Sequence, residues 1–388
     1  LFGLQISSYS RDTLIFRDEI SIPYIGNYFD YYEDLIVRGN NPNEFLKRSN
    51  RLAISPDSLH KLLNKGVVAK QYDIVFIDEC EQDVLHFNAK TMKNKEINLG
   101  VLSWLLKHST YQILADADLG DLTTSYLNDI ELHSGQLVIN EHKPRKDSLM
   151  KIYGDNMQLR HSMLERLQTE PIFYCSNSKD RVLEVERMLL ESGIDQNQIQ
   201  AVHSGNSGTN EIQQFILDIN QEVRDLHVVL ASPSLGTGVS IDKGHPFTAV
   251  YAEFSHRSGT AEQAHQQMAR PRGINEYHVW VDPAFNNYET DVEEIKRVLL
   301  DKPEVDEVNL FTFDINAGEM VAKDELFEKV YCRNKAFENL NRNYFAIRFI
   351  QQAENEGYSI EHIKYENSAV EEIELMTKDI REQLKEEL

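Results

Sequence analysis

Two adjacent acidic residues that follow a short apolar run could take part in metal chemistry. Residues 74–77 (IVFI) are β-branched or aromatic, and Asp78 and Glu79 come directly after them. Such a run favours a buried strand of a parallel sheet, and ligands bind beyond the carboxyl ends of these strands. One carboxylate there could hold Mg²⁺, and the second could position or deprotonate an attacking water. The alternative is an ordinary strand that ends in two solvated acids.

A second run of the same kind also ends in acids. Residues 111–115 (YQILA) predict a strand, and Asp116 and Asp118 follow it. Taken alone, these two residues could simply be solvated acids at a strand end.

Glycines and arginines in the second half of the chain could bind phosphate. Gly236, Thr237 and Gly238 follow a predicted strand, and Asp242 lies just beyond them. Glycines let the backbone approach a phosphate or a ribose closely. A predicted helix over 260–269 carries Gln266, which could hold a water or a phosphate, and leads into two arginines. The alternatives are a simple turn and ordinary surface charges.

The two arginines at the end of that helix are Arg270 and Arg272. A guanidinium suits a γ-phosphate because it forms bidentate, charge-assisted hydrogen bonds and stays protonated.

The elements around these residues predict two α/β lobes, each with a parallel sheet. Strands alternate with helices for more than a hundred residues, and after a polar stretch the same alternation begins again. In the first lobe, Ser55 is expected to cap a helix that starts at Pro56. The predicted strands are 51–55, 73–77, 111–115, 171–175, 199–202, 226–230, 248–253 and 276–281.

The length of 388 residues implies two or three domains. We predict a first lobe over 1–150, a second lobe over 151–288 and a mostly helical accessory region over 289–388. Within the accessory region, the tail from Val370 to Leu388 is expected to be a charged helix.

The composition is that of a soluble globular protein, with 41% hydrophobic and 9% aromatic residues. No apolar run approaches the roughly 18 residues that a membrane helix needs, so no membrane partner is expected. The three cysteines, Cys80, Cys175 and Cys332, form no C-x-x-C pair, which predicts a reducing compartment, the cytoplasm, and no structural zinc. The net charge of −23 argues weakly against nucleic-acid binding but leaves room for a local basic groove.

Over residues 50–285 the order of these motifs resembles a superfamily 2 (DExx-box) helicase. The segment from Asp78 to Glu81 is similar to the DExx box, Ser232–Asp242 to motif V and Gln266–Arg272 to motif VI. The segments SPDSLHKL, IDECEQ, LADADLGD, SLGTGVSID and QQMARPRG are most similar to replication-initiator helicases of the herpesvirus origin-binding and plasmid types.

The resemblance implies two tandem RecA-like lobes that hydrolyse ATP with Mg²⁺ and move along DNA. Asp78 and Glu79 would hold the metal and act in catalysis together with Gln266, Arg270 and Arg272, one arginine being the finger. The nucleotide would be bound by Gly236, Thr237, Gly238 and Asp242, and Asp116 and Asp118 would couple hydrolysis to strand movement.

The implied partner is single-stranded or forked DNA, at a replication origin, together with replication proteins. We expect a track of backbone contacts across both lobes, which would carry no sequence information. Its residues would be Ser55, Ser58 and His60 in the first lobe and Ser178, Lys179 and His203 in the second. The alternative for each is an ordinary helix cap or a surface polar residue.

The chain departs from the family pattern at two places. Arg270 and Arg272 are two residues apart, whereas a spacing of three is common in the family. Either residue could therefore be the arginine finger. No G-x-x-x-x-G-K-[ST] loop occurs in the sequence, and the family would place it just upstream of Leu1. We therefore expect an N-terminally incomplete chain that hydrolyses ATP poorly or not at all by itself, and an active parent protein.

Two other functions remain open. One is a degenerate helicase-like scaffold that binds DNA or a protein without turnover, which the missing loop and the negative charge would favour. The other is a metal-dependent glycosyltransferase that uses Asp116 and Asp118 as a D-x-D motif. It would leave the glycines and arginines of the second lobe unexplained.

Overall fold

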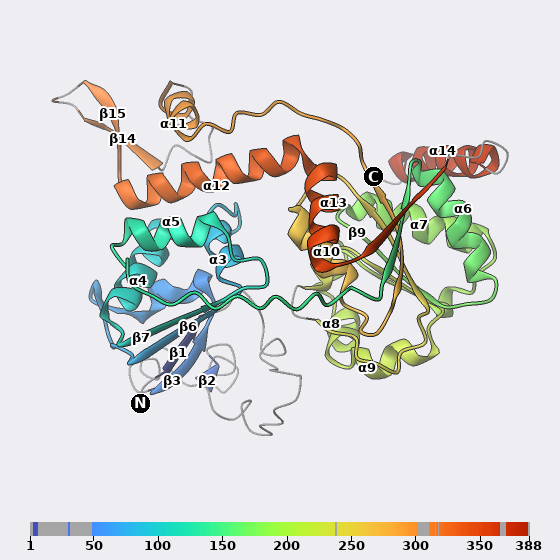
Figure 1. The fold of residues 1–388 in the computed structure, drawn as a ribbon, viewed down its shortest axis with the longest axis horizontal. Helices are drawn as coiled ribbons and strands as arrows, with labels where there is room; N and C mark the ends of the chain where they lie inside the picture. The colour runs from blue at the N-terminus through green and yellow to red at the C-terminus, as the bar shows by residue number, and fades with distance from the viewer. Residues whose placement is uncertain are drawn as a thin grey trace. The chain divides into compact units, whose positions relative to one another are not determined.

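The computed structural model describes residues 3–6, 30–31, 49–236, 239–301, 310–314, 316, 318–364 and 370–386. It divides the chain into two compact units (Figure 1). Unit 1 comprises Leu1–Val138 and Glu289–Asn339, and unit 2 comprises Ile139–Tyr288 and Leu340–Leu388. Each unit is built around its own sheet.

The described strands of unit 1 form a parallel sheet in the order β2-β3-β1-β6-β7. These strands are β1 (Gly3–Ile6), β2 (Asp30–Tyr31), β3 (Arg51–Ile54), β6 (Ile74–Asp78) and β7 (Tyr111–Ala115). Strand β6 pairs with β1 on one side and with β7 on the other, and its last residue, Asp78, lies opposite Ala115. The two predicted acidic strand ends are therefore neighbours.

Helices and a β-hairpin complete unit 1. They are the 3₁₀ helix η3 (Pro56–Leu62), the hairpin of β4 (Leu63–Asn64) and β5 (Val67–Val68), and the helices α3 (Cys80–His86), α4 (Lys95–His108) and α5 (Asp121–Asp129). The later segment adds α11 (Val292–Asp301), β14 (Phe311–Asp314), β15 (Glu319–Ala322) and most of α12 (Glu325–Asn343). Phe327 and Val330 of α12 lie in the same apolar core as Val75 and Leu102.

In unit 2, seven described strands form a parallel sheet in the order β10-β11-β9-β12-β13-β8-β16. Their bounds are β8 (Leu149–Tyr153), β9 (Ile172–Ser176), β10 (Ile199–Val202), β11 (Val228–Ala231), β12 (Ala249–Phe254), β13 (Glu276–Val281) and β16 (Ser359–Ile363). Strands β9, β11 and β12 are buried along their whole length, as expected of central parallel strands with apolar sequences.

Helices cover unit 2 in two groups. The helices α6 (Asn156–Leu167), α7 (Lys179–Glu191) and α14 (Val370–Glu386) share one apolar core and lie side by side (Figure 1). A second core includes residues of α8 (Asn210–Leu217), α10 (Ala261–Met268) and α13 (Phe345–Glu356). Short helices complete the unit: η4 (Gln196–Gln198), α9 (Ile219–Glu222), η5 (Val223–Asp225) and η6 (Pro233–Leu235).

The predicted fold class is confirmed: two α/β lobes with parallel sheets precede a mostly helical region. The division of the chain differs from the expected one. Residues 289–339 belong to unit 1 and 340–388 to unit 2, because Phe327 lies in one core and Phe345 in the other. The first boundary falls at Val138 instead of residue 150, because strand β8 already belongs to unit 2.

An ion-pair network ties the C-terminal helix to the sheet of unit 2. Arg160 of α6 and Glu253 of β12 are both fully buried, with 2.7 Å between Arg160 Nε and Glu253 Oε1. Arg160 also donates to Glu184 of α7, which in turn accepts from Arg381 of α14 at 2.7 Å. Arg181 adds a second cation to Glu253 at 3.0 Å. Helices α6, α7 and α14 are thereby fixed around one buried carboxylate.

Among the residues that the structure describes, no helix has both the length and the apolar character to cross a membrane. The three cysteines are buried, and each carries a free thiol.

Candidate functional site

The carboxyl end of β6 presents the two predicted catalytic acids. Burial, and then the nearby charge of Asp116, raise the pKa of Asp78 above its usual value. Glu79 has left-handed backbone angles, φ 56° and ψ 49°, and precedes α3. For a residue other than glycine this conformation is strained, and such strain is concentrated at functional sites. Glu131, an exposed residue with φ 61°, is a useful comparison because it lies in an ordinary turn.

Asp116 joins the two acidic strand ends through its carboxylate. Its Oδ2 accepts from the backbone N–H of Glu81 at 2.8 Å, and its Oδ1 accepts from that of Asp118 at the same distance. Burial raises the pKa of Asp116 despite these bonds. Asp116 therefore fixes the start of α3 relative to the turn after β7. Because both of its oxygens already accept backbone donors, Asp116 is a poor candidate for the metal ligand of a D-x-D motif.

Glu81 supports the acidic strand ends structurally, a role that its sequence position does not reveal. Its two carboxylate oxygens accept from the backbone N–H groups of Leu122 and Thr123 at 3.1 and 3.0 Å, at the start of α5. A carboxylate there satisfies helix N–H groups that would otherwise lack partners. Gly120 leaves the space for it, since a Cβ at Gly120 would lie 2.8 Å from Glu81 Oε1. The only indication of this role in the sequence is that Glu81 is the third acidic residue of the segment Asp78–Glu81 (DECE).

Replacing Gly120 by alanine is expected to destabilise unit 1 by about 1 to 3 kcal/mol, because the added methyl group displaces the Glu81 carboxylate from two buried N–H groups. The chain has two tryptophans, Trp104 in unit 1 and Trp280 in unit 2. In a Trp280→Phe background, urea unfolding followed by Trp104 fluorescence reports on unit 1. In a protein that also carries Glu81→Ala, Gly120→Ala is expected to lower the free energy of unfolding of unit 1 far less. Equal costs in both backgrounds would rule out this contact as the cause.

The acids at the end of β6 could hold a divalent cation only with help from a ligand. Among the described residues, no group of three or more His, Cys, Asp or Glu side chains is placed to bind a metal ion. Mg²⁺ is usually bound through one or two carboxylates, with waters and substrate phosphates as its other ligands. A bound cation would oppose the effect of burial on the pKa of Asp78, because it would favour the charged form of the carboxylate.

Two candidate DNA contacts of unit 1, Ser58 and His60, lie on η3, and the third, Ser55, directly precedes it. A buried asparagine holds this helix. Asn98 of α4 accepts from the backbone N–H of His60 at 2.7 Å and lies 3.0 Å from its ring Nδ1. Ser58 is nearly buried and accepts from Lys61 Nζ, and the Ser55 side chain makes no capping hydrogen bond. The predicted α-helix after Ser55 is a 3₁₀ helix. Of the three candidate contacts, Ser55 and His60 are partly exposed, whereas Ser58 is buried.

In unit 2, the structure brings Lys179 and His203 together at the sheet edge where β9 and β10 end. A Cβ at Gly205 would lie 3.1 Å from His203 Nδ1 and 3.3 Å from Lys179 Nζ, so both side chains border one glycine. Burial, and then the charge of Lys179, lower the pKa of His203. Ser178 caps α7 by accepting from Arg181 N–H at 3.4 Å. Two polar groups next to an open glycine suit a backbone phosphate.

The predicted nucleotide-binding glycines are only partly described. Thr237 and Gly238 lie outside the described residues. Gly236 has φ 85° after η6, a conformation that favours glycine. Asp242 is held by Asn220 of α9, which accepts from its N–H at 2.7 Å. Its carboxylate also accepts from the Asn220 side chain at 3.4 Å.

The two candidate finger arginines have different surroundings. Arg270 is 3% exposed, and its Nη1 donates to the carbonyl of Val239 at 3.2 Å. Arg272 is exposed, and its Nε donates to Ser240 Oγ at 3.1 Å. Both are anchored by Ile241, whose N–H donates to Arg270 O and whose carbonyl accepts from Arg272 N–H. Gln266 lies on α10, one turn before Arg270, and is partly buried.

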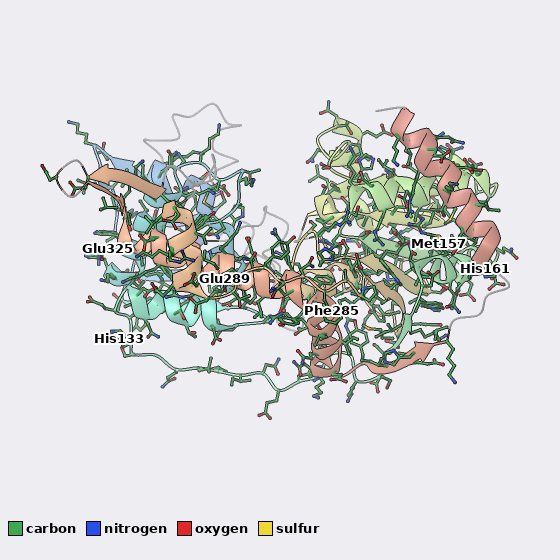
Figure 2. All side chains as sticks on the ribbon, turned by 90° about the horizontal axis from the view of Figure 1, so that it is seen from above. His133, Met157, His161, Phe285, Glu289 and Glu325 are labelled. Atoms are coloured by element: carbon green, nitrogen blue, oxygen red, sulfur yellow. The ribbon has the colours of Figure 1, made fainter. Side chains whose placement is uncertain are left out.

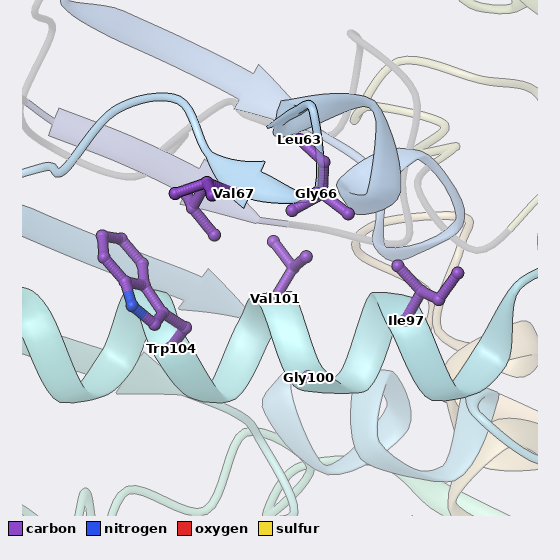
Figure 3. A pocket seen from close by; sticks show the side chains of 8 residues that line it. Leu63, Gly66, Val67, Ile97, Gly100, Val101 and Trp104 are labelled. Atoms are coloured by element: carbon purple, nitrogen blue, oxygen red, sulfur yellow. The ribbon is translucent and has the colours of Figure 1, made fainter.

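The candidate residues thus form separate groups. Within unit 1, Asp78, Glu79, Asp116 and Asp118 lie together at one sheet edge. Within unit 2, the motif V segment pairs with the motif VI segment through Ile241 and Pro271. An apolar hollow of unit 1 between α4 and the β4–β5 hairpin is a different feature, because it has no charged side chain in its lining (Figure 3). It is lined by Leu63, Gly66, Val67, Val68, Ile97, Gly100, Val101 and Trp104.

The chain is similar to a viral protein named for helicase and primase activity. Over 326 residues it is 22% identical to the "Putative helicase/primase complex protein" of African swine fever virus, strain Badajoz 1971 Vero-adapted. The match covers 80% of this chain and 30% of the relative, and the protein of isolate Tick/South Africa/Pretoriuskop Pr4/1996 is 21% identical over the same shares. The chain spans about 30% of the length of these curated relatives. No protein-family model matches it.

Two solved structures match the chain at low sequence identity. Dbp5 of S. cerevisiae, bound to RNA and ADP BeF3, gives a TM-score of 0.48 at 10% identity, covering 98% of this chain and 81% of its own. The DUF1998 helicase MrfA, bound to DNA, gives 0.46 at 12% identity, covering 90% and 49%. At these scores no residue role is transferred from either structure.

Proposed function

We propose that this chain is the motor part of an ATP-dependent DNA helicase or translocase of the replication-initiation type. The observation that supports it most is the acidic edge of unit 1, where Asp78, a strained Glu79 and Asp116 meet at adjacent strand ends. The similarity to a helicase/primase complex protein points to the same class of activity.

In this proposal Asp78 would hold the Mg²⁺ that accompanies ATP, and Glu79 would position or deprotonate the attacking water. In unit 2, the backbone at Gly236 and the side chain of Asp242 are the proposed nucleotide-binding groups. Asp116, through Glu81 and Asp118, links the acids to the turn after β7 and so couples hydrolysis to movement.

The proposed partner is single-stranded or forked DNA at a replication origin, contacted through Ser55, Ser58 and His60 in unit 1. In unit 2, Ser178, Lys179 and His203 make the corresponding contacts. Association with other replication proteins and a cytoplasmic location are part of the proposal.

The test is ATP hydrolysis stimulated by single-stranded DNA, measured on the longest polypeptide that the gene encodes. Glu79→Gln is expected to lower the stimulated rate by about a hundredfold or more while ATP still binds, since it removes only the group that activates water. Glu131→Gln is the matched control, because Glu131 has the same left-handed backbone conformation but lies in a turn.

An unchanged rate in Glu79→Gln would exclude this mechanism. A wild-type polypeptide that binds DNA without hydrolysing ATP would instead favour the degenerate scaffold, which the net charge of −23 also fits.

A further inference from the structure

Four large side chains of unit 2 that the proposed function does not use are exposed, and the two segments that carry them are hydrogen-bonded to each other. Phe285 is 67% exposed (Figure 2), and Tyr288, Tyr344 and Ile347 are between 43% and 47% exposed. Large exposed apolar groups that occur together mark interaction sites more often than scattered ones do. We call Phe285, Tyr288 and Tyr344, together with Arg342, the aromatic platform.

Hydrogen bonds hold the platform in place. Asn343 accepts from the backbone N–H of Tyr288 and donates to its carbonyl, each at 2.8 Å. Asn286 donates to the carbonyl of Arg342 at 2.9 Å. The loop after β13 is thereby fastened to the junction of α12 and α13, where Tyr344 lies. Rigid aromatic rings lose little entropy when a ligand stacks on them.

The platform also carries a positive charge. The guanidinium of Arg342 lies 6.0 Å from the centre of the Tyr288 ring. In the described part of the chain, no carboxylate forms an ion pair with Arg342, although Arg348, six residues on, is paired with Glu262 at 2.8 Å. A cation beside exposed rings suits a ligand that offers both flat π-systems and negative charge.

The strand order places the platform on the edge that carries the proposed phosphate contacts. Phe285 and Tyr288 follow the carboxyl end of β13, and Lys179 and His203 follow those of β9 and β10. These strands are parallel members of one sheet, so their carboxyl ends line one edge. Strands β9 and β13 are separated only by β12, a distance of about 10 Å at the usual strand spacing.

We infer that the aromatic platform binds the bases of a single strand of nucleic acid whose backbone runs past Lys179 and His203. Tyr288 and Tyr344 stack on bases, and Arg342 neutralises a neighbouring phosphate. This inference rests on the proposed function, because it extends the nucleic-acid track of unit 2. It assigns the binding of bases to a surface that lies outside the segments resembling helicase motifs.

The test is fluorescence anisotropy of a labelled oligo(dT) with the full chain. Tyr288→Ala and Tyr344→Ala are each expected to raise Kd by about tenfold, while Tyr288→Phe keeps the wild-type affinity because the ring remains. An abasic oligonucleotide of the same length is expected to bind these variants and the wild type alike. Tyr111→Ala, at an exposed tyrosine of unit 1, is the matched control.

Lys179→Ala separates this inference from the proposed function. It is expected to weaken oligo(dT) and abasic strands equally and to flatten the dependence of affinity on salt, as loss of a phosphate contact should. If Lys179→Ala weakens binding while both tyrosine variants bind like wild type, the platform is wrong and the proposed function stands. If the tyrosine variants lose as much affinity for the abasic strand as for oligo(dT), stacking on bases is excluded. A wild-type chain that binds neither strand would contradict both proposals.

Discussion

Arg160→Met is expected to lower the free energy of unfolding of unit 2 by about 3 to 5 kcal/mol, because it leaves the charge of Glu253 buried without its main partner. The Glu253 side chain is completely buried, and Arg160 donates to both of its oxygens, at 2.7 and 3.1 Å. Burial alone would raise the pKa of Glu253, but the charges of Arg160 and Arg181 outweigh it and the pKa is lowered. Methionine keeps most of the buried volume, so the loss is electrostatic.

The measurement is urea unfolding followed by Trp280 fluorescence in a Trp104→Phe background, which makes Trp280 of unit 2 the only tryptophan. Arg257→Met is the control, because Arg257 is an exposed arginine of the same unit. Adding Glu253→Met to Arg160→Met is expected to recover much of the loss, since no unpaired buried carboxylate then remains. A double variant as unstable as Arg160→Met would contradict the electrostatic explanation.

The same network has a pH dependence with a definite sign. Because the folded state lowers the pKa of Glu253, its contribution to stability is fully present above the usual glutamate pKa. It is lost as the pH falls through the lower folded value. Acid is therefore expected to release the anchoring of α6 and α7, and in the Glu253→Met double variant this acid-dependent loss should be reduced.

The central strands of both sheets were predictable because their sequences are short apolar runs. Residues 172–175 are buried on both faces of their sheet and residues 74–77 are buried or partly buried, so nearly every residue is apolar and the pattern stands out. The amphipathic helix α7 is predictable for a similar reason, since Ser178 caps it and its apolar residues recur with helical spacing.

The edge strand β16 was missed because its sequence, SIEHI, alternates between exposed and partly buried positions. The neighbouring strand β8 (LMKIY) was hidden by the polar stretch before it and by its central lysine, which is paired with Glu276 on β13. Edge strands need only one buried face, and a cross-strand ion pair lets a charged residue lie within the sheet. Neither property is visible in a local window of sequence.

The candidate site was predictable as residues but not as an arrangement. Asp78, Glu79 and Asp116 follow apolar runs and could be found from their positions alone. The role of Glu81 as the cap of α5 depends on Gly120, 39 positions away, and the support of η3 depends on Asn98. Such contacts depend on the fold, which determines which helix start lies beside which acid. The chain passes through unit 1, unit 2, unit 1 and unit 2 in turn. This order could not be predicted from the sequence for the same reason.

Arg272→Ala is expected to lower DNA-stimulated ATP hydrolysis by about a thousandfold without changing stability, because we propose that Arg272 is the arginine finger. Arg270 is enclosed in unit 2 and bonded to the Val239 carbonyl, whereas Arg272 is exposed and its Nε donates to Ser240. An exposed guanidinium can reach a γ-phosphate by turning its side chain. A buried one would first have to break packing that holds motifs V and VI together.

Arg270→Met therefore provides the contrast. It keeps volume in the core but removes a buried hydrogen bond, so it is expected to lower the urea midpoint of unit 2, read from Trp280 in the Trp104→Phe background. Any loss of hydrolysis should follow the loss of folded protein. Arg272→Lys should hydrolyse ATP nearly as poorly as Arg272→Ala, because an ammonium cannot make the paired bonds of a planar guanidinium. If Arg270→Met stays folded and inactive while Arg272→Ala remains active, the assignment of the finger is reversed, and unit 2 must then rearrange its motif V and VI segments to expose Arg270.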